Sequence, residues 1–227
     1  MTTVDRARAD NLSRPVLFIV GTILVLAACG LGALIFSRQA PFEIDETWNA
    51  LLFSNPIPFL TGFSQVMNFL GAGWFSILVV PIAVALVLFF MKRPWSALFF
   101  IAAQIASAGA VQALKHLFGR ARPEEIIVIS DFGSYPSGHV ANAATLAAVA
   151  FILFPRLIVA IIGAVYVVLM AISRTAVHAH WLTDTIGGAL IGVGVVLIVA
   201  GFFAPLLVRE RSGARSSVRP ESSTAPQ

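Results

Sequence analysis

The charged residues of this 227-residue chain are spaced so widely that most of the sequence falls into long uncharged apolar runs. Only 11% of the residues are charged and 58% are apolar, whereas a soluble domain carries about 25% charged residues. A helix needs roughly 17–25 apolar residues to cross a bilayer. Five intervals between charges fit this length directly, at 15–37, 94–114, 132–155, 157–173 and 185–208. The sequence therefore predicts a helical integral membrane protein.

The uncharged interval from 47 to 91 exceeds one span, and its composition divides it. Its second half, 74–91, is uniformly apolar and is predicted to be a sixth span. Its first half contains Pro56 and Pro58, which interrupt helices, and is predicted to be an interfacial loop or a short helix. The expected fold is an all-α membrane protein, a bundle of six transmembrane helices over 15–208. It follows a segment at 1–14 and precedes a disordered basic tail at 209–227.

The basic residues are distributed unevenly between the two sides of such a bundle. With six spans, ten of the fifteen Lys and Arg residues lie on the side that holds both termini, and the positive-inside rule makes this side the cytoplasm. A seventh helix at 48–70 would remove this bias. The net charge of +4 is therefore attributed to orientation in a bilayer, and nucleic acid is not an expected partner. The predicted location is the cell membrane, crossed several times.

Five basic residues remain for the outer face, and four of them lie in the two loops after the third and fifth spans. All four histidines of the chain are expected on this face as well. Ionisable groups are costly at membrane depth, so basic residues clustered on the side that the positive-inside rule disfavours indicate a function. Binding of an anionic substrate at the extracytoplasmic surface would explain the cluster. The five residues are Arg38, Lys115, Arg120, Arg122 and Arg174.

Three short patterns carry these outer residues. The first has Lys115 followed seven residues later by Arg122 and Pro123; the second is residues 134–139, SYPSGH; the third is Ser173-Arg174 followed by His180 and Asp184. Together they resemble the three-part signature KxxxxxxRP, PSGH and SRxxxxxHxxxD of the type-2 phosphatidic acid phosphatase superfamily. Any one pattern is weak evidence, but all three in order on one predicted face make a strong match that covers residues 115–184.

The residue types suit phosphate chemistry. A phosphoryl group carries charge on its nonbridging oxygens, which the planar guanidinium groups of Arg122 and Arg174 can bind in pairs, and Lys115 adds a compact charge. Ser137 and Gly138 precede the fourth predicted span, where free backbone N–H groups form an anion site. Such a cradle would hold a phosphate without a metal ion, and we expect no cofactor.

His180 and Asp184 are four residues apart, so on a helix they would share a face and the carboxylate would hold the imidazole tautomer. This arrangement is typical of a nucleophile with its orienting group. His139 is placed to protonate the leaving oxygen. The resemblance implies the same assignment, with a phosphohistidine on His180, His139 as the acid, and the cradle residues holding the oxygens.

Other residues have structural interpretations. Arg120 is expected to extend toward water at a helix end, and His178 with Trp181 to lie in an interfacial belt. The pair Gly188 and Gly192 predicts close helix packing. Four intramembrane polar residues either bond between helices or contact a head group, and the sequence does not distinguish these roles: Gln104, Ser107, Gln112 and Asn142.

The leading functional hypothesis is a metal-independent phosphatase of a lipid phosphate or pyrophosphate. Three candidate substrates offer the same anionic head: phosphatidic acid, phosphatidylglycerol phosphate and undecaprenyl pyrophosphate. The predicted orientation and the resemblance favour undecaprenyl pyrophosphate or a glycerophospholipid phosphate. A metal-dependent hydrolase is an alternative, because three histidines and a carboxylate could make a metal site, from His139, His178, His180 and Asp184. A carrier that only binds anionic lipids is the third possibility.

Overall fold

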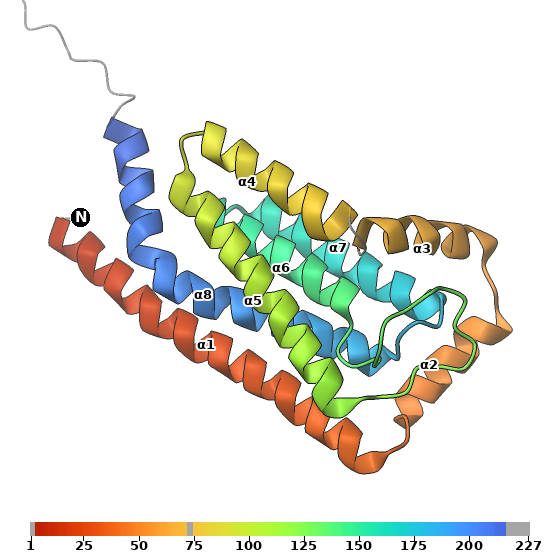
Figure 1. The fold of residues 1–227 in the computed structure, drawn as a ribbon. Helices are drawn as coiled ribbons and strands as arrows, with labels where there is room; N and C mark the ends of the chain where they lie inside the picture. The colour runs from red at the N-terminus through yellow and green to blue at the C-terminus, as the bar shows by residue number, and fades with distance from the viewer. Residues whose placement is uncertain (1–2, 72–74, 217–227) are drawn as a thin grey trace, which may run out of the picture.

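The computed structural model of the chain describes residues 3–71 and 75–216, which form helices joined by short connections and one long loop (Figure 1). Within these residues there is no β-strand, which confirms the predicted all-α class. The elements are α1 (Thr3–Arg38), α2 (Glu43–Ser54), α3 (Pro58–Gly71), a π-helical segment η1 (Phe75–Val79), α4 (Val80–Phe90), α5 (Pro94–Phe118), α6 (Gly138–Leu153), α7 (Leu157–Ala176) and α8 (Leu182–Ser216).

Among the described residues, four helices are long and apolar enough to cross a bilayer, namely α1 from Arg14, α5, α7, and α8 as far as Ser212. They match four of the predicted spans. The helix α3 and the segment Phe75–Phe90 meet the same criterion only together, as a pair bent by 48°. The predicted span 132–155 shortens to the 16 residues of α6, about 24 Å, which is less than the hydrocarbon core. The count of six spans and the orientation of the termini remain predictions.

Two predicted segments are more helical than expected. Within residues 47–71, expected to be an interfacial loop or a short helix, the structure has most of α2 and all of α3, two short helices separated at Asn55–Ile57 beside the two prolines. The predicted disordered tail begins inside α8, which continues to Ser216. Positions 72–74 and 217–227, which belong to these predicted segments and to the predicted sixth span, lie outside the described residues.

The short helix α6 lies at the centre of the bundle, where it packs against α5, α7 and α8. Small residues permit the close approach of α8. A Cβ atom added to Gly188 would lie 2.6 Å from the carbonyl oxygen of Ser137, and one added to Gly192 would lie 2.5 Å from that of Ala141. The predicted role of this glycine pair in helix packing is confirmed, and the contact fixes the start of α6 against the start of α8.

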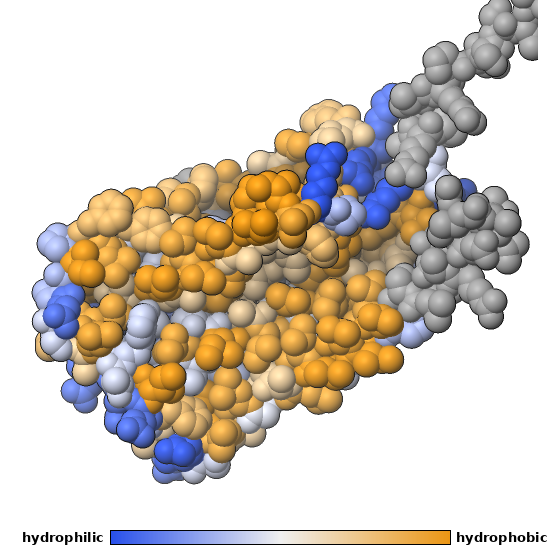
Figure 2. All heavy atoms as spheres, turned by 180° about the vertical axis from the view of Figure 1, so that it is seen from behind, coloured by the Kyte–Doolittle hydropathy of each residue, from blue (hydrophilic) through white to orange (hydrophobic). Residues whose placement is uncertain are grey.

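Apolar side chains dominate the outer surface between the two ends of the bundle. Figure 2 shows a broad hydrophobic band with hydrophilic residues gathered at its ends. The exposed apolar side chains include Ile19 and Ile23 of α1 and Ile158 and Ile162 of α7. An apolar surface of this extent is suited to lipid rather than water, as the composition predicts.

The connections that carry the three sequence patterns meet at one end of the bundle. The loop 119–137, the turn between α7 and α8, and α2 lie together there, whereas the α4–α5 turn and the far end of α8 lie at the other end (Figure 1). The loop begins because Gly119 ends α5 in the left-handed conformation, at φ 53°. The prediction that these segments share one face is confirmed.

Candidate active site

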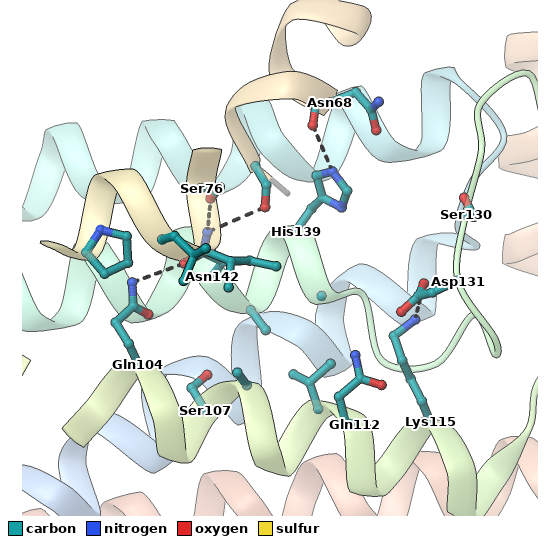
Figure 3. A pocket seen from close by; sticks show the side chains of 18 of the residues that line it. Asn68, Ser76, Gln104, Ser107, Gln112, Lys115, Ser130, Asp131, His139 and Asn142 are labelled. Carbon is teal, nitrogen blue, oxygen red and sulfur yellow. Dashed lines mark hydrogen bonds and ion pairs between the residues drawn. The ribbon is translucent and has the colours of Figure 1, made fainter. Parts of the chain in front are cut away.

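A cavity of about 800 Å³ opens between α5, α6, the segment η1–α4 and the loop before α6. Figure 3 shows His139 on one side of this cavity and Lys115 on the other, with Asp131 of the loop beside Lys115. One part of the wall is charged, and the part formed by η1–α4 and the middle of α5 is mainly apolar. Five of the eight predicted site residues line the cavity: Lys115, Arg122, Gly138, His139 and His180.

The other three predicted residues are fully buried behind the cavity wall. Asp184 lies behind His180, and Arg174 lies behind His139. Ser137 precedes α6, and its N–H donates to the carbonyl oxygen of Asp184 at 3.0 Å. Among the described residues the Ser137 hydroxyl has no hydrogen-bond partner. The structure thus brings all eight residues together but places only five of them at the cavity surface.

His180 is held between a carboxylate and a cation, one at each ring nitrogen. Its Nδ1 lies 3.6 Å from Oδ2 of Asp184, slightly beyond hydrogen-bond length. Its Nε2 lies 3.3 Å from Nη1 of Arg122. A carboxylate on the Nδ1 side favours the tautomer with the proton on Nδ1. The lone pair of Nε2 then faces the cation and the cavity.

Asp184 is fixed by three donors, which do not include His180. Its Oδ2 accepts from the backbone N–H of Trp181 at 2.8 Å, and its Oδ1 accepts from Nη1 of Arg120 at 2.5 Å. The other terminal nitrogen of Arg120 donates to Asp45 of α2 at 2.7 Å. The backbone N–H of Ser137 holds the Asp184 carbonyl. This carboxylate is therefore positioned before any substrate arrives.

The interpretation of Arg120 as a residue extended toward water is wrong. Its side chain is only 6% exposed and bridges two carboxylates that are fully buried, Asp45 and Asp184. Thr183 completes this cluster, because its N–H and hydroxyl both donate to Asp45, at 2.8 and 2.7 Å. Buried ionised groups persist when they are paired and hydrogen-bonded, as they are here. Arg120 therefore joins α2 to the carboxylate behind His180.

The charge state of His180 follows from its surroundings. Burial lowers the pKa of its imidazole to about 4; Asp184 opposes this shift, while the positive charges of Arg122 and Lys115 add to it. The ring is consequently neutral near pH 7 and keeps the lone pair that a nucleophile needs.

The two cations that line the cavity share one carboxylate. Asp131 Oδ1 accepts from Lys115 Nζ at 3.2 Å and from Arg122 Nη2 at 2.9 Å. The Gly133 carbonyl oxygen accepts from the same two side chains, at 2.7 and 2.9 Å. Burial would raise the pKa of the Asp131 carboxyl, but the charge and hydrogen bond of Lys115, together with the charge of Arg122, hold it below its ordinary value. An anion is thus already favoured beside these two cations.

His139 is held on the opposite wall by α3 and α7. Its Nε2 lies 3.2 Å from the carbonyl oxygen of Asn68 and 3.3 Å from Nη1 of Arg174. Arg174 in turn donates to the Asn68 side chain at 2.6 Å and to the carbonyl oxygen of Ser64 at 2.8 Å. Arg174 therefore positions His139 and α3, and its predicted contact with substrate oxygens stays a prediction.

His178 does not lie in an interfacial belt, and this interpretation is also wrong. It is 7% exposed, and its Nδ1 lies 2.7 Å from the side-chain oxygen of Asn49 in α2. Across residues 14–71 and 75–212, no three His, Cys, Asp or Glu side chains are grouped so that they could hold a metal ion. The alternative metal site from His139, His178, His180 and Asp184 is therefore not supported by the geometry.

Four features of the site were not predicted from the sequence, namely Asp45, Asn68, Asp131 and the pairing of Arg120. The signal for Arg120 was present, because it lies two residues before Arg122 in an outer loop where the orientation rule disfavours it. Asp45 and Asn68 belong to α2 and α3, far from the three patterns in sequence. Only the fold shows that these helices reach the site.

The chain is similar in sequence to known phosphatases. Residues 93–206, half of the chain, match the model of the PAP2 superfamily. Phosphatidylglycerophosphatase B of Bacillus subtilis (strain 168) is 29% identical over 155 residues, which cover 64% of this chain and 76% of that protein. Lipid A 1-phosphatase of Rhizobium johnstonii is 26% identical over 199 residues, which cover 83% of this chain and 80% of that protein.

Two solved structures share the fold. A transmembrane PAP2-type phosphatidylglycerolphosphate phosphatase from Bacillus subtilis superposes with a TM-score of 0.69 at 25% identity, over 88% of this chain and 98% of that one. LpxE of Aquifex aeolicus gives 0.60 at 25% identity, over 70% of this chain and 95% of that one. The chain therefore belongs to the PAP2 superfamily and is a phosphoric monoester hydrolase.

Proposed function

We propose that the chain is a lipid phosphatase that works without a metal ion, through a phosphohistidine on His180. The observation that carries this proposal is the position of His180 Nε2, which lies next to Arg122 at the cavity. Cationic side chains line one part of the cavity wall, and mainly apolar residues line another part. A lipid phosphate has the same division between an anionic head and an apolar chain. The apolar wall of η1–α4 and α5 would hold the chain while the cations hold the head.

The proposed reaction has two displacements at phosphorus. In the first, Lys115 and Arg122 bind nonbridging oxygens in place of Asp131, and Nε2 of His180 attacks phosphorus. The bond from phosphorus to the lipid oxygen breaks, its electron pair stays on that oxygen, and His139 donates a proton to it. Asp184 stabilises the positive charge that develops on His180.

In the second displacement, water attacks the phosphohistidine. His139, now neutral, accepts a proton from this water as the phosphorus–nitrogen bond breaks. The electron pair returns to Nε2 of His180, and inorganic phosphate leaves when the substrate is a monoester. Ser137, Gly138 and Arg174 are proposed to stabilise phosphate oxygens during both steps. The free N–H groups at the start of α6 and the unpartnered hydroxyl of Ser137 support this role.

The proposed active site faces the extracytoplasmic side of the cell membrane. The support is the distribution of basic residues, since the end of the bundle opposite the site holds the Lys92–Arg93 turn and Arg209. The positive-inside rule places that opposite end in the cytoplasm. With α6 and the pair α3 and η1–α4 counted as spans, both termini would be cytoplasmic.

The substrate is proposed to be a phosphate of a glycerophospholipid, such as phosphatidylglycerol phosphate or phosphatidic acid. One similar protein is named a phosphatidylglycerophosphatase and another a lipid A 1-phosphatase. Undecaprenyl pyrophosphate is the competing substrate. It shares the anionic head and is also favoured by the sequence-based prediction.

Phosphate release from a detergent-solubilised lipid panel tests the proposal. The panel contains phosphatidic acid, phosphatidylglycerol phosphate, lipid A 1-phosphate and undecaprenyl pyrophosphate, with the His180→Ala protein as blank. We expect release from at least one glycerophospholipid phosphate, well above the blank and unaffected by a chelator. Binding of these lipids with no release above the blank would instead establish the carrier hypothesis. Release that a chelator abolishes and zinc restores would contradict the metal-independent reaction.

The acid limb of the pH profile should reflect the low pKa of His180. Because burial lowers this pKa to about 4, the imidazole stays neutral as the pH falls through 6.5 and becomes protonated only near pH 4. We expect kcat/KM, corrected for the separately titrated second ionisation of the substrate phosphate, to hold down to about pH 5 and to fall below it. A corrected limb near 6.5 would contradict a buried, neutral nucleophile.

A further inference from the structure

The cavity continues past the charged site and contains polar side chains where the surrounding wall is apolar. Gln104 of α5, Asn142 of α6 and Ser76 of η1 line this deeper part, and we call these three residues the polar rung. The Gln104 side-chain N–H donates to the Asn142 oxygen at 3.3 Å, and the Asn142 side-chain N–H donates to the Ser76 hydroxyl oxygen at 2.7 Å (Figure 3). The rung thus links three separate elements across the cavity.

The rung retains hydrogen-bonding capacity that the described protein does not use. Within residues 14–71 and 75–212, the second N–H of the Gln104 amide and the hydroxyl proton of Ser76 have no protein acceptor. Unpaired polar groups are costly at membrane depth, so residues that line a cavity there are candidates for ligand contact. The π-helical turn that places Ser76 is itself a feature found frequently at functional sites.

A second polar pair in the same helices behaves differently. The Thr145 hydroxyl of α6 donates to the Ser107 hydroxyl of α5 at 2.8 Å, and both residues are buried. Ser107 lines the cavity and Thr145 does not. Because this buried pair already joins α5 to α6 by a hydrogen bond, the polar rung is not needed to link these two helices.

The depth of the rung limits the chemical group that could reach it. Asn142 follows His139 by three residues on α6, which places it about 4.5 Å deeper along the helix axis. The ester carbonyls of a glycerolipid lie only a few bonds from its phosphorus, at a comparable depth. The chain of a polyprenyl monophosphate presents only hydrocarbon there, so it would leave the donors of Gln104 and Ser76 unpaired.

We propose that the polar rung is a second binding subsite, in which Gln104 and Ser76 donate hydrogen bonds to the ester carbonyls of a glycerolipid phosphate while Asn142 holds both side chains in place. The subsite selects ester-linked glycerolipid phosphates over polyprenyl phosphates. This inference rests on the proposed lipid phosphatase function, because it concerns the substrate of the same cavity. It adds a specificity determinant that the three sequence patterns do not contain.

The test compares diacyl phosphatidic acid with its dialkyl ether analogue of equal chain length. The two lipids have the same phosphate and glycerol, and they differ only in the two carbonyls. For the unaltered protein we expect kcat/KM to be about 5- to 10-fold higher for the ester lipid, the effect of one or two hydrogen bonds. In Gln104→Met, which keeps the length of the side chain without its amide, the ester-to-ether ratio should fall toward one, because only the hydrogen bond from Ser76 remains.

Two further variants make the result decisive. Thr145→Val removes an intramembrane hydrogen bond by changing a residue that does not line the cavity, and it should keep the ratio of the unaltered protein. Ser76→Ala should lower the ratio even if Gln104→Met fails to fold. An equal ratio in the unaltered protein and both rung variants would overturn the subsite, as would a loss of activity that is the same for ester and ether lipids. No release from either lipid by the unaltered protein would instead refute the proposed function on phosphatidic acid.

Discussion

Replacing His180 with alanine is expected to lower phosphate release from phosphatidic acid or phosphatidylglycerol phosphate by about 10⁴-fold or more, the size expected when a nucleophile is lost. The fold should survive, because Asp184 keeps its bonds to Arg120 and to the Trp181 N–H. The measurement is kcat/KM of the purified variant in detergent, together with its melting temperature. Loss of activity without loss of stability would assign His180 to chemistry.

His116→Ala is the matched control for this variant. His116 lies on α5 one residue after Lys115, but its ring is exposed, and its Nδ1 contacts the Gln112 carbonyl oxygen of the same helix at 2.8 Å. It does not line the cavity. We expect its activity to stay within about twofold of the unaltered protein. A His180→Ala protein that keeps more than a few per cent of the activity would contradict the proposed nucleophile.

Replacing Arg120 with methionine should destabilise the protein more than any other single change in the site. The substitution leaves the carboxylates of Asp45 and Asp184 fully buried and without their shared cation. Loss of one partner from such a buried pair costs about 3–5 kcal/mol. In a chain of this size the loss corresponds to a melting temperature lowered by roughly 10 °C, measured by thermal unfolding in detergent.

Arg122→Met offers a comparison two residues away. Arg122 shares Asp131, a half-exposed carboxylate, with Lys115, so its loss leaves no fully buried charge without a partner. It should lower kcat/KM strongly and the melting temperature only slightly. Adding Asp45→Asn to Arg120→Met should recover part of the lost stability, because it removes one of the stranded charges. Equal melting temperatures for the two single variants would contradict the bridging role of Arg120.

The spacing of charges predicted much of the fold because the bilayer imposes a length on every span. Four long helices fall where the uncharged intervals indicated, and the glycine pair at 188 and 192 packs α8 against α6 as expected. The same reasoning overestimated the span that became α6. The length of an uncharged interval shows only where charges are absent. It therefore includes uncharged loop residues, such as 132–137, together with the helix that follows them.

The candidate site was predictable where its residues lie in local patterns. Lys115, Arg122, His139 and His180 are separated by up to 65 positions, but each sits at a helix end or in a loop whose side of the membrane can be counted from the sequence. The network behind them was not predictable in this way. Asp45 meets Arg120 across 75 positions and Asn68 meets Arg174 across 106, and neither partner lies in a pattern that indicates pairing.

The surroundings of each intramembrane polar residue also could not be predicted from the sequence. Gln104 and Asn142 read as intramembrane polar groups with two possible roles, and the difference between them is whether the side chain faces a cavity or a neighbouring helix. That difference depends on the π-helical segment η1 and on the bend between α3 and α4, which open the cavity beside α5. Local sequence does not specify either feature.

Trapping of the covalent intermediate tests the central claim most directly. The protein is mixed with phosphatidic acid carrying a radioactive phosphate, quenched within milliseconds in alkaline denaturant, and digested to locate the label. The expected result is a base-stable, acid-labile label on His180 in the unaltered protein and none in the His180→Ala protein. Rapid phosphate release with the label on another residue, or with water incorporated by a single inversion at phosphorus, would contradict attack by His180.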